Sequence, residues 1–125
     1  MPVKSYQDLI AWRRAMELVV EVYEMTKGFP KDERFGLTNQ VRRAAVSVPS
    51  NIAEGQGRGV GAEFAHHLRI AQGSLQEVET QVMLGQRLGF PEAAPSSFPW
   101  LTKRAACSGG FTRPFAADAS LATSN

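Results

Sequence analysis

Four arginines are the residues of this chain best suited to recognising a ligand. Arg42, Arg43, Arg58 and Arg69 could hold phosphate groups, because a guanidinium donates hydrogen bonds in a planar fork that matches them. Acidic residues nearby in the sequence would weaken such a basic field. These are Glu54, Glu63, Glu77 and Glu79. The four arginines are therefore candidate RNA-binding residues, and their surroundings leave a structural role open.

A polar stripe overlaps these arginines. Arg43, Ser47, Asn51 and Glu54 follow one another at steps of four, four and three, which places them on one face of a helix. The stripe can be a solvated face or a hydrogen-bonded network that holds this helix to its neighbour. It can also be a subunit interface or a nucleic-acid contact.

No constellation of residues predicts catalysis. His66 and His67 are adjacent, so they point to different sides of a helix, and we expect both at the surface. Glu77 and Glu79 are two residues apart and do not form a carboxylate pair for acid–base chemistry. Cys107 lies in no nucleophile motif. We therefore expect a protein that is not an enzyme, with no metal, no cofactor and no small-molecule substrate.

The bulk composition predicts a single cytoplasmic domain. Of the 125 residues, 43% are hydrophobic and 21% are charged, which is ordinary for a globular protein. The formal net charge of +2 does not by itself indicate a nucleic-acid partner. A single cysteine excludes an internal disulfide and fits a reducing compartment. No segment has the length and apolarity of a signal peptide or a membrane span.

The spacing of apolar residues predicts three long helices, at about residues 5–27, 33–54 and 62–88. Ser5 and Asp8 have the spacing of a capping box at the start of the first. The expected apolar stripes are Leu9, Trp12, Met16, Val19, Val20 and Tyr23 in the first helix, Leu37, Val41, Ala45, Val48 and Ile52 in the second, and Phe64, Leu68, Ala71, Leu75, Val78 and Val82 in the third.

Three features interrupt or end this pattern. Pro49 predicts a kink in the second helix, or its division into two short helices. The glycines of residues 55–61 predict a flexible connection. Residues 91–125 are rich in Ala, Ser and Pro and read as a divergent tail, in which only residues 97–107 have the pattern of a short helix.

Residues from about Tyr6 to Phe90 resemble the 23S rRNA-intervening sequence proteins, which are small four-helix-bundle proteins. The most distinctive part is the segment VRRAAVSVPSNIAEGQGR, Val41 to Arg58. The resemblance also rests on Asp8-Leu9, Trp12, Phe29-Pro30, Arg34, Gly36-Leu37, Glu63-Phe64, Gly73-Ser74, Glu77 and Arg87-Leu88-Gly89. It implies an all-α fold, an antiparallel up-and-down bundle of the four-helix type. It also implies a homo-oligomer, with a pentamer as the expected form.

Two functions of different class follow. The first is a non-catalytic oligomeric scaffold that binds RNA or a ribonucleoprotein partner, which is implied by the family's association with sequences inserted in ribosomal RNA genes. The second is a protein–protein oligomerisation module with no nucleic-acid role, which the balanced charge favours. Convergence of Arg42, Arg43 and Arg58 on one rim of the assembly would favour the first. Pairing of these arginines with Glu54 and Glu63 would favour the second.

The fourth helix of the family should follow Phe90, and no helix of that length is predicted there. A frame shifted by two bases across the codons of residues 98–111 can encode a sequence similar to that helix. We therefore expect a frameshifted tail, an expectation that sequencing the gene across this region would test. Without the fourth helix, the other three would leave an apolar groove that the tail or a neighbouring chain must cover.

Overall fold

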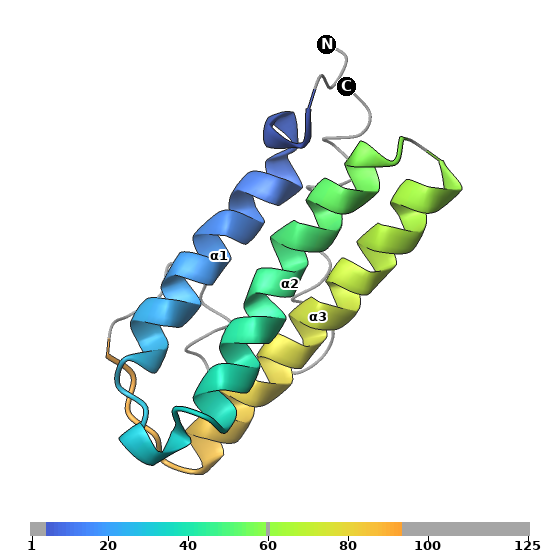
Figure 1. The fold of residues 1–125 in the computed structure, drawn as a ribbon. Coiled ribbons are helices and arrows are strands. Elements are labelled where there is room, and N and C mark those ends of the chain that lie inside the picture. Colours follow the sequence, from blue (N-terminus) through green and yellow to red (C-terminus); the bar gives the residue numbers. More distant parts are fainter. Residues whose placement is uncertain (1–4, 60, 94–125) are drawn as a thin grey trace.

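The described part of the chain is all-helical, as predicted. The computed structural model describes residues 5–59 and 61–93. Within these ranges it has no strand and three α-helices, α1 (Ile10–Thr26), α2 (Leu37–Gly57) and α3 (Ala62–Arg87). Single 3-10 turns precede the first two, η1 (Tyr6–Asp8) and η2 (Lys31–Glu33). Figure 1 shows the helices side by side, with the chain reversing direction at each connection.

The central helix is α2, which packs against both α1 and α3, while α1 and α3 make little direct contact with each other. To do so, α2 buries residues over a wide part of its circumference. They are Leu37, Thr38, Val41, Ala44, Ala45, Val48, Pro49, Ile52 and Gly55. The apolar stripe predicted for this helix is confirmed, because all five of its residues are buried.

The stripe of α3 is confirmed as well. Phe64, Ala71, Leu75, Val78 and Val82 are buried, and Leu68 packs half-buried against the same core. Their steps of three and four are those of a helix that packs along a neighbouring helix. The helix ends in a left-handed glycine, Gly89 (φ 78°), beyond which the Phe90 amide donates to the Gly85 carbonyl at 2.9 Å.

The stripe predicted for α1 is wrong for three of its six residues, since Trp12 and Val19 pack half-buried against the core. Leu9 is buried, but Met16, Val20 and Tyr23 are 43%, 60% and 41% exposed. The core instead receives another row of residues, Ala11, Ala15, Leu18, Val22 and Met25. Alanines at the first two positions have little side chain, so α1 can approach its neighbour closely there, and the larger residues turn outward.

The predicted helix boundaries also need correction. The Ser5–Asp8 capping box forms, but it caps the 3-10 turn η1, and extended backbone at Leu9 delays the start of α1. The second helix begins at Leu37, because residues 31–33 form η2. Of the two outcomes predicted at Pro49, the division into two short helices is wrong, since α2 is continuous through this residue.

The glycine-rich connection is shorter than predicted, because α2 extends to Gly57. The turn contains glycines with positive φ, Gly59 (108°) and Gly61 (90°), in a region that other residues rarely occupy. The expected short helix at residues 97–107, Cys107 and nearly all of the predicted tail lie outside the described residues. None of the helices described here has the length and apolarity to cross a membrane.

α2 and α3 approach each other closely at Gly55. A Cβ atom added there would lie 2.6 Å from the Cβ of His67. We expect Gly55→Ala to lower the free energy of unfolding by about 1–3 kcal/mol, because the helices would have to separate. Gly73→Ala is the matched control, since no atom lies within 4 Å of its added Cβ. That exposed helix position should gain about 1 kcal/mol. Urea denaturation followed by circular dichroism measures both, and an unchanged Gly55→Ala protein would contradict the close approach.

Candidate functional site

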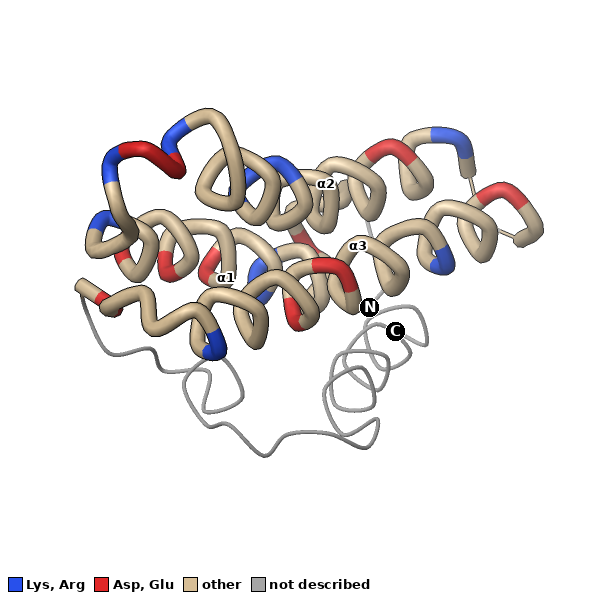
Figure 2. Tube along the Cα trace, turned by 90° about the horizontal axis from the view of Figure 1, so that it is seen from below, with Lys and Arg blue, Asp and Glu red and all other residues tan. Residues whose placement is uncertain are grey.

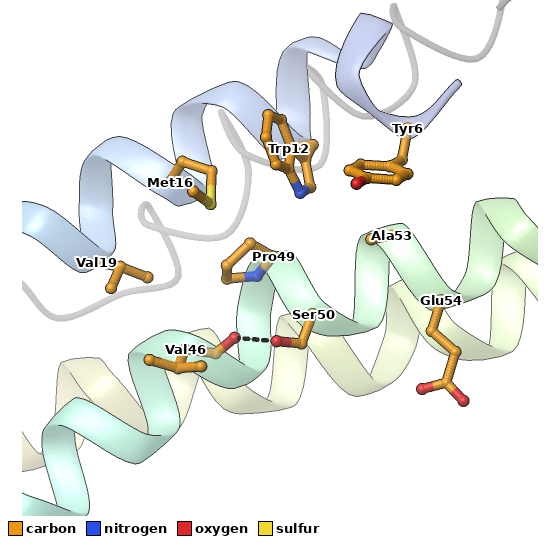
Figure 3. A pocket seen from close by; sticks show the side chains of 9 residues that line it. All are labelled: Tyr6, Trp12, Met16, Val19, Val46, Pro49, Ser50, Ala53 and Glu54. Atoms are coloured by element: carbon orange, nitrogen blue, oxygen red, sulfur yellow. Dashed lines mark hydrogen bonds between the residues drawn. The ribbon is translucent and has the colours of Figure 1, made fainter. Parts of the chain in front are cut away.

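An apolar groove runs along the outer side of the α1–α2 pair. It has a volume of about 560 Å³. Its lining consists of Tyr6, Trp12, Met16, Val19, Val46, Pro49, Ser50, Ala53 and Glu54. Figure 3 shows Trp12 and Met16 extending from α1 toward Pro49 of α2. The Tyr6 ring stacks edge-on against Trp12, with centroids 5.2 Å apart, and lines one end of the groove.

The groove exists because α1 carries two apolar rows. One row, from Ala11 to Met25, is buried in the core. The other consists of Trp12, Met16, Val19 and Tyr23, at steps of four, three and four, and its first three members line the groove. Residues at this spacing form a continuous strip along a helix that suits packing against another helix. Trp12 and Val19 of this row are half-buried against the core, whereas Met16 is 43% exposed, so the described residues leave this side of α1 only partly covered.

The polar stripe of α2 contributes to the contact with α3. The Oγ atoms of Ser47 and Ser74 are hydrogen-bonded across the two helices at 2.8 Å. The Asn51 Nδ2 donates to the carbonyl and the Oγ of Ser47, at 2.8 and 3.0 Å. These two members of the stripe therefore have partners within the chain, whereas Arg43 lies exposed at its start.

Glu54, the last member of the stripe, lies between two groups. Its Oε2 is 3.2 Å from the Arg58 guanidinium and 3.7 Å from Nε2 of His67. The His67 Nδ1 is 2.9 Å from the Glu63 carbonyl, which can only accept, so Nδ1 carries a proton. The expectation of a surface position is wrong for His67, which is buried where α3 passes Gly55.

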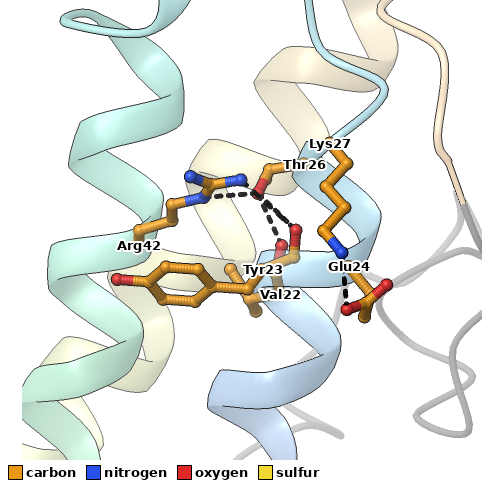
Figure 4. Close-up of polar contacts among 6 residues, drawn as sticks. All are labelled: Val22, Tyr23, Glu24, Thr26, Lys27 and Arg42. Atoms are coloured by element: carbon orange, nitrogen blue, oxygen red, sulfur yellow. Dashed lines mark hydrogen bonds and ion pairs between the residues drawn. The ribbon is translucent and has the colours of Figure 1, made fainter.

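Arg42 is used inside the protein. Its Nε donates to Thr26 Oγ1 at 2.8 Å, and its NH2 group donates to the Tyr23 carbonyl at 3.3 Å. The guanidinium also stacks over the Tyr23 ring, 4.5 Å from the centroid. Figure 4 shows the side chain reaching from α2 to the last turn of α1. A cation there suits the negative end of the helix dipole and ties the two helices together.

The candidate RNA-binding arginines do not form one patch. Arg42 contacts α1 and Arg58 pairs with Glu54, while Arg43 and Arg69 are exposed. Arg43 and Arg58 are 15 residues apart on one helix, which separates them by about 22 Å. Figure 2 shows Lys and Arg distributed among Asp and Glu. The described residues contain ten Lys and Arg against eleven Asp and Glu, so their summed charge is slightly negative.

Two acidic residues of α3, Glu77 and Glu79, have different surroundings. Glu77 accepts a hydrogen bond from Gln81 Nε2 at 3.2 Å. Partial burial raises the pKa of the Glu79 carboxyl. Within residues 5–59 and 61–93, no group of three His, Cys, Asp or Glu side chains is placed to hold a metal ion.

Sequence reasoning found the residues of the α1 row but assigned them to the core. The signal that could have corrected this is the second heptad row, Ala11, Ala15, Leu18, Val22 and Met25, one residue out of step with the first. The contribution of α2 to the groove was missed. Val46 and Ala53 fall outside its predicted stripe, and Pro49 was considered only for its effect on the helix backbone.

The contacts of Arg42 predict a structural role that Arg43 lacks. Arg42→Ala removes two charged hydrogen bonds and the stacking on Tyr23. It should lower the free energy of unfolding by about 1–2 kcal/mol. Arg43→Ala, at the adjacent exposed position, should change it by less than about 0.5 kcal/mol. Chemical denaturation of both variants measures the difference, and equal stabilities would show that the Arg42 contacts do not hold α1 to α2.

Comparison with known proteins agrees with the resemblance noted from the residues. The family model of the 23S rRNA-intervening sequence protein matches residues 7–97, a range that includes α1, α2 and α3. Residues 98–125 lie outside the match. No curated protein sequence matches the chain. Because the family model covers well over half of its length, the chain belongs to the 23S rRNA-intervening sequence protein family.

Proposed function

We propose that this protein is a non-catalytic helical scaffold that works by self-association through the α1–α2 groove. The second apolar row of α1 is the observation that carries the proposal. Large side chains at helical spacing stay open to solvent there, although a single helix packed on one neighbour needs only one such row. Extended apolar surfaces of this kind are typical of protein–protein interfaces.

The distribution of charge supports a protein partner over a nucleic acid. Two of the four candidate arginines are engaged within the chain, Arg42 by α1 and Arg58 by Glu54. The described residues have no excess of positive charge. The core of a protein interface is usually poor in charge and rich in aromatic residues and Met, as this groove is, with Tyr6, Trp12 and Met16.

For the complete assembly we propose the antiparallel four-helix architecture of the family, repeated in a ring of copies such as a pentamer. The match of the family model over residues 7–97 supports this architecture, as does the reversal of chain direction between α1, α2 and α3 in Figure 1.

Self-association is tested by placing a charge in the groove. We expect the full chain to form oligomers whose mass depends on concentration in sedimentation velocity. Met16→Lys should weaken the association at least about tenfold, because a buried unpaired ammonium is costly. Ile70→Lys is the control, since Ile70 is a similarly exposed apolar residue on α3. A wild-type chain that remains monomeric at every concentration would overturn the proposal.

RNA binding is a second candidate, favoured by the exposed Arg43 and Arg69 and by the family's name. If these arginines contact phosphates, binding of labelled ribosomal RNA fragments should weaken steeply with salt. The slope against log salt concentration should fall by about 1 for each arginine removed in Arg43→Ala/Arg69→Ala.

Arg58→Ala is the control for this measurement, because Glu54 already pairs with the Arg58 charge. Its slope should stay close to that of the wild type. A folded wild-type chain that binds no RNA at low salt would leave the protein-binding scaffold as the function.

A further inference from the structure

Phe35 is a protruding side chain, in contrast to the concave groove between α1 and α2. Phe35, between η2 and α2, is 82% exposed, the largest value among the exposed large hydrophobic residues that the structure describes. The Arg34 guanidinium lies over its ring, 4.8 Å from the centroid. Phe35 is therefore a protruding aromatic residue accompanied by a positive charge.

The turn that presents Phe35 is held by hydrogen bonds on both sides. The Arg34 amide donates to the Lys31 carbonyl at 3.1 Å, and the Gly36 amide donates to the Glu33 carbonyl at 2.9 Å. The Glu33 carboxylate accepts from the Leu37 amide at 2.9 Å. A side chain on such a preorganised turn loses little conformational freedom when it binds a partner.

Phe35 cannot reach the groove of its own chain. Val46, the first lining residue on α2, is nine residues beyond Leu37, which is about 14 Å along the helix axis. The other α2 residues of the groove, Pro49 to Glu54, lie still farther along. A contact between Phe35 and such a groove must therefore join two copies of the chain.

The charges next to the two features are complementary. Among the residues that line the groove, Glu54 is the charged one, and its carboxylate lies at the rim, about half exposed, with one oxygen, Oε2, 3.2 Å from Arg58. Arg34 lies over the Phe35 ring, whereas the Glu33 carboxylate beside it is directed at the Leu37 amide. Phe35 entering the groove would bring a positive charge toward a negative one, which favours this pairing over other orientations.

We propose that Phe35 of one copy inserts into the α1–α2 groove of a second copy, between Trp12, Met16 and Pro49, with Arg34 directed toward Glu54. The proposal rests on the self-association proposed above and names the two surfaces that meet. The groove volume of about 560 Å³ has room for an aromatic ring. Because the inserting residue and the receiving groove are different surfaces, each copy offers one of each.

This arrangement makes a prediction about mixtures of variants. Phe35→Ala keeps the groove and loses the inserting ring, whereas Met16→Lys keeps the ring and blocks the groove. Each variant alone should associate at least about tenfold more weakly than the wild type. Mixed in equal amounts, they should form heterodimers, because the ring of one fits the groove of the other. Sedimentation velocity of the full chains, with one variant carrying a fluorescent label, measures this.

Ile70→Ala and Ile70→Lys are the matched controls on α3, and both should associate like the wild type. Circular dichroism confirms that each variant is folded. If the wild type associates and Phe35→Ala associates equally well, this proposal is overturned while self-association stands. The same holds if both variants dissociate and their mixture remains monomeric. A monomeric wild type overturns this proposal together with the proposed function.

Discussion

The fold depends on one constraint, which is that α2 must bury two sides of itself at once. Its partners α1 and α3 hardly touch each other, so each is positioned by its contact with α2. A small residue makes this possible on one side, because Gly55 has no side chain and the Cβ of His67 on α3 can lie close to the α2 backbone there. Polar side chains of α2 then fix both neighbours, Arg42 on the last turn of α1 and Ser47 on Ser74 of α3.

This use of α2 changes the interpretation of its polar residues. In the sequence, Arg42-Arg43 and the stripe from Arg43 to Glu54 have the types expected of a nucleic-acid surface. In the structure, Arg42 and Ser47 bond to neighbouring helices. Asn51 and Glu54 bond along α2 itself, to Ser47 and Arg58, and Arg43 is exposed. The groove between α1 and α2 is lined mainly by apolar side chains, which is why it is a stronger candidate site than the arginines.

The sequence correctly predicted the buried faces of α2 and α3. The prediction for the buried face of α1 was incorrect, for a physical reason. In α2 and α3 one row of apolar residues is clearly larger than any other, so periodicity alone locates the core. In α1 two rows one residue apart have the same spacing, and the buried row begins with Ala11 and Ala15. Hydrophobic size favours the wrong row there, because close packing between helices selects small residues.

The side-chain contacts between helices could not be predicted from the sequence, for a similar reason. Ser47 pairs with Ser74, and His67 is buried beside Glu54, because of how α2 and α3 are rotated about their axes. A rotation of one residue position would exchange these partners, and no local pattern specifies it. The position of the groove could not be predicted for the same reason, because it depends on which row of α1 is buried in the core.

The two rows of α1 also restrict how this helix can vary. A helix packed on one side tolerates polar substitution over most of its surface, and evolution can change those positions freely. In α1, five positions from Ala11 to Met25 serve the core, and Trp12, Met16 and Val19 line the groove. Polar replacements are thereby confined to the other side of the helix, where Arg13, Arg14, Glu17, Glu21 and Glu24 already lie. This helix should therefore accept fewer neutral mutations than a helix of the same length that packs on one side only.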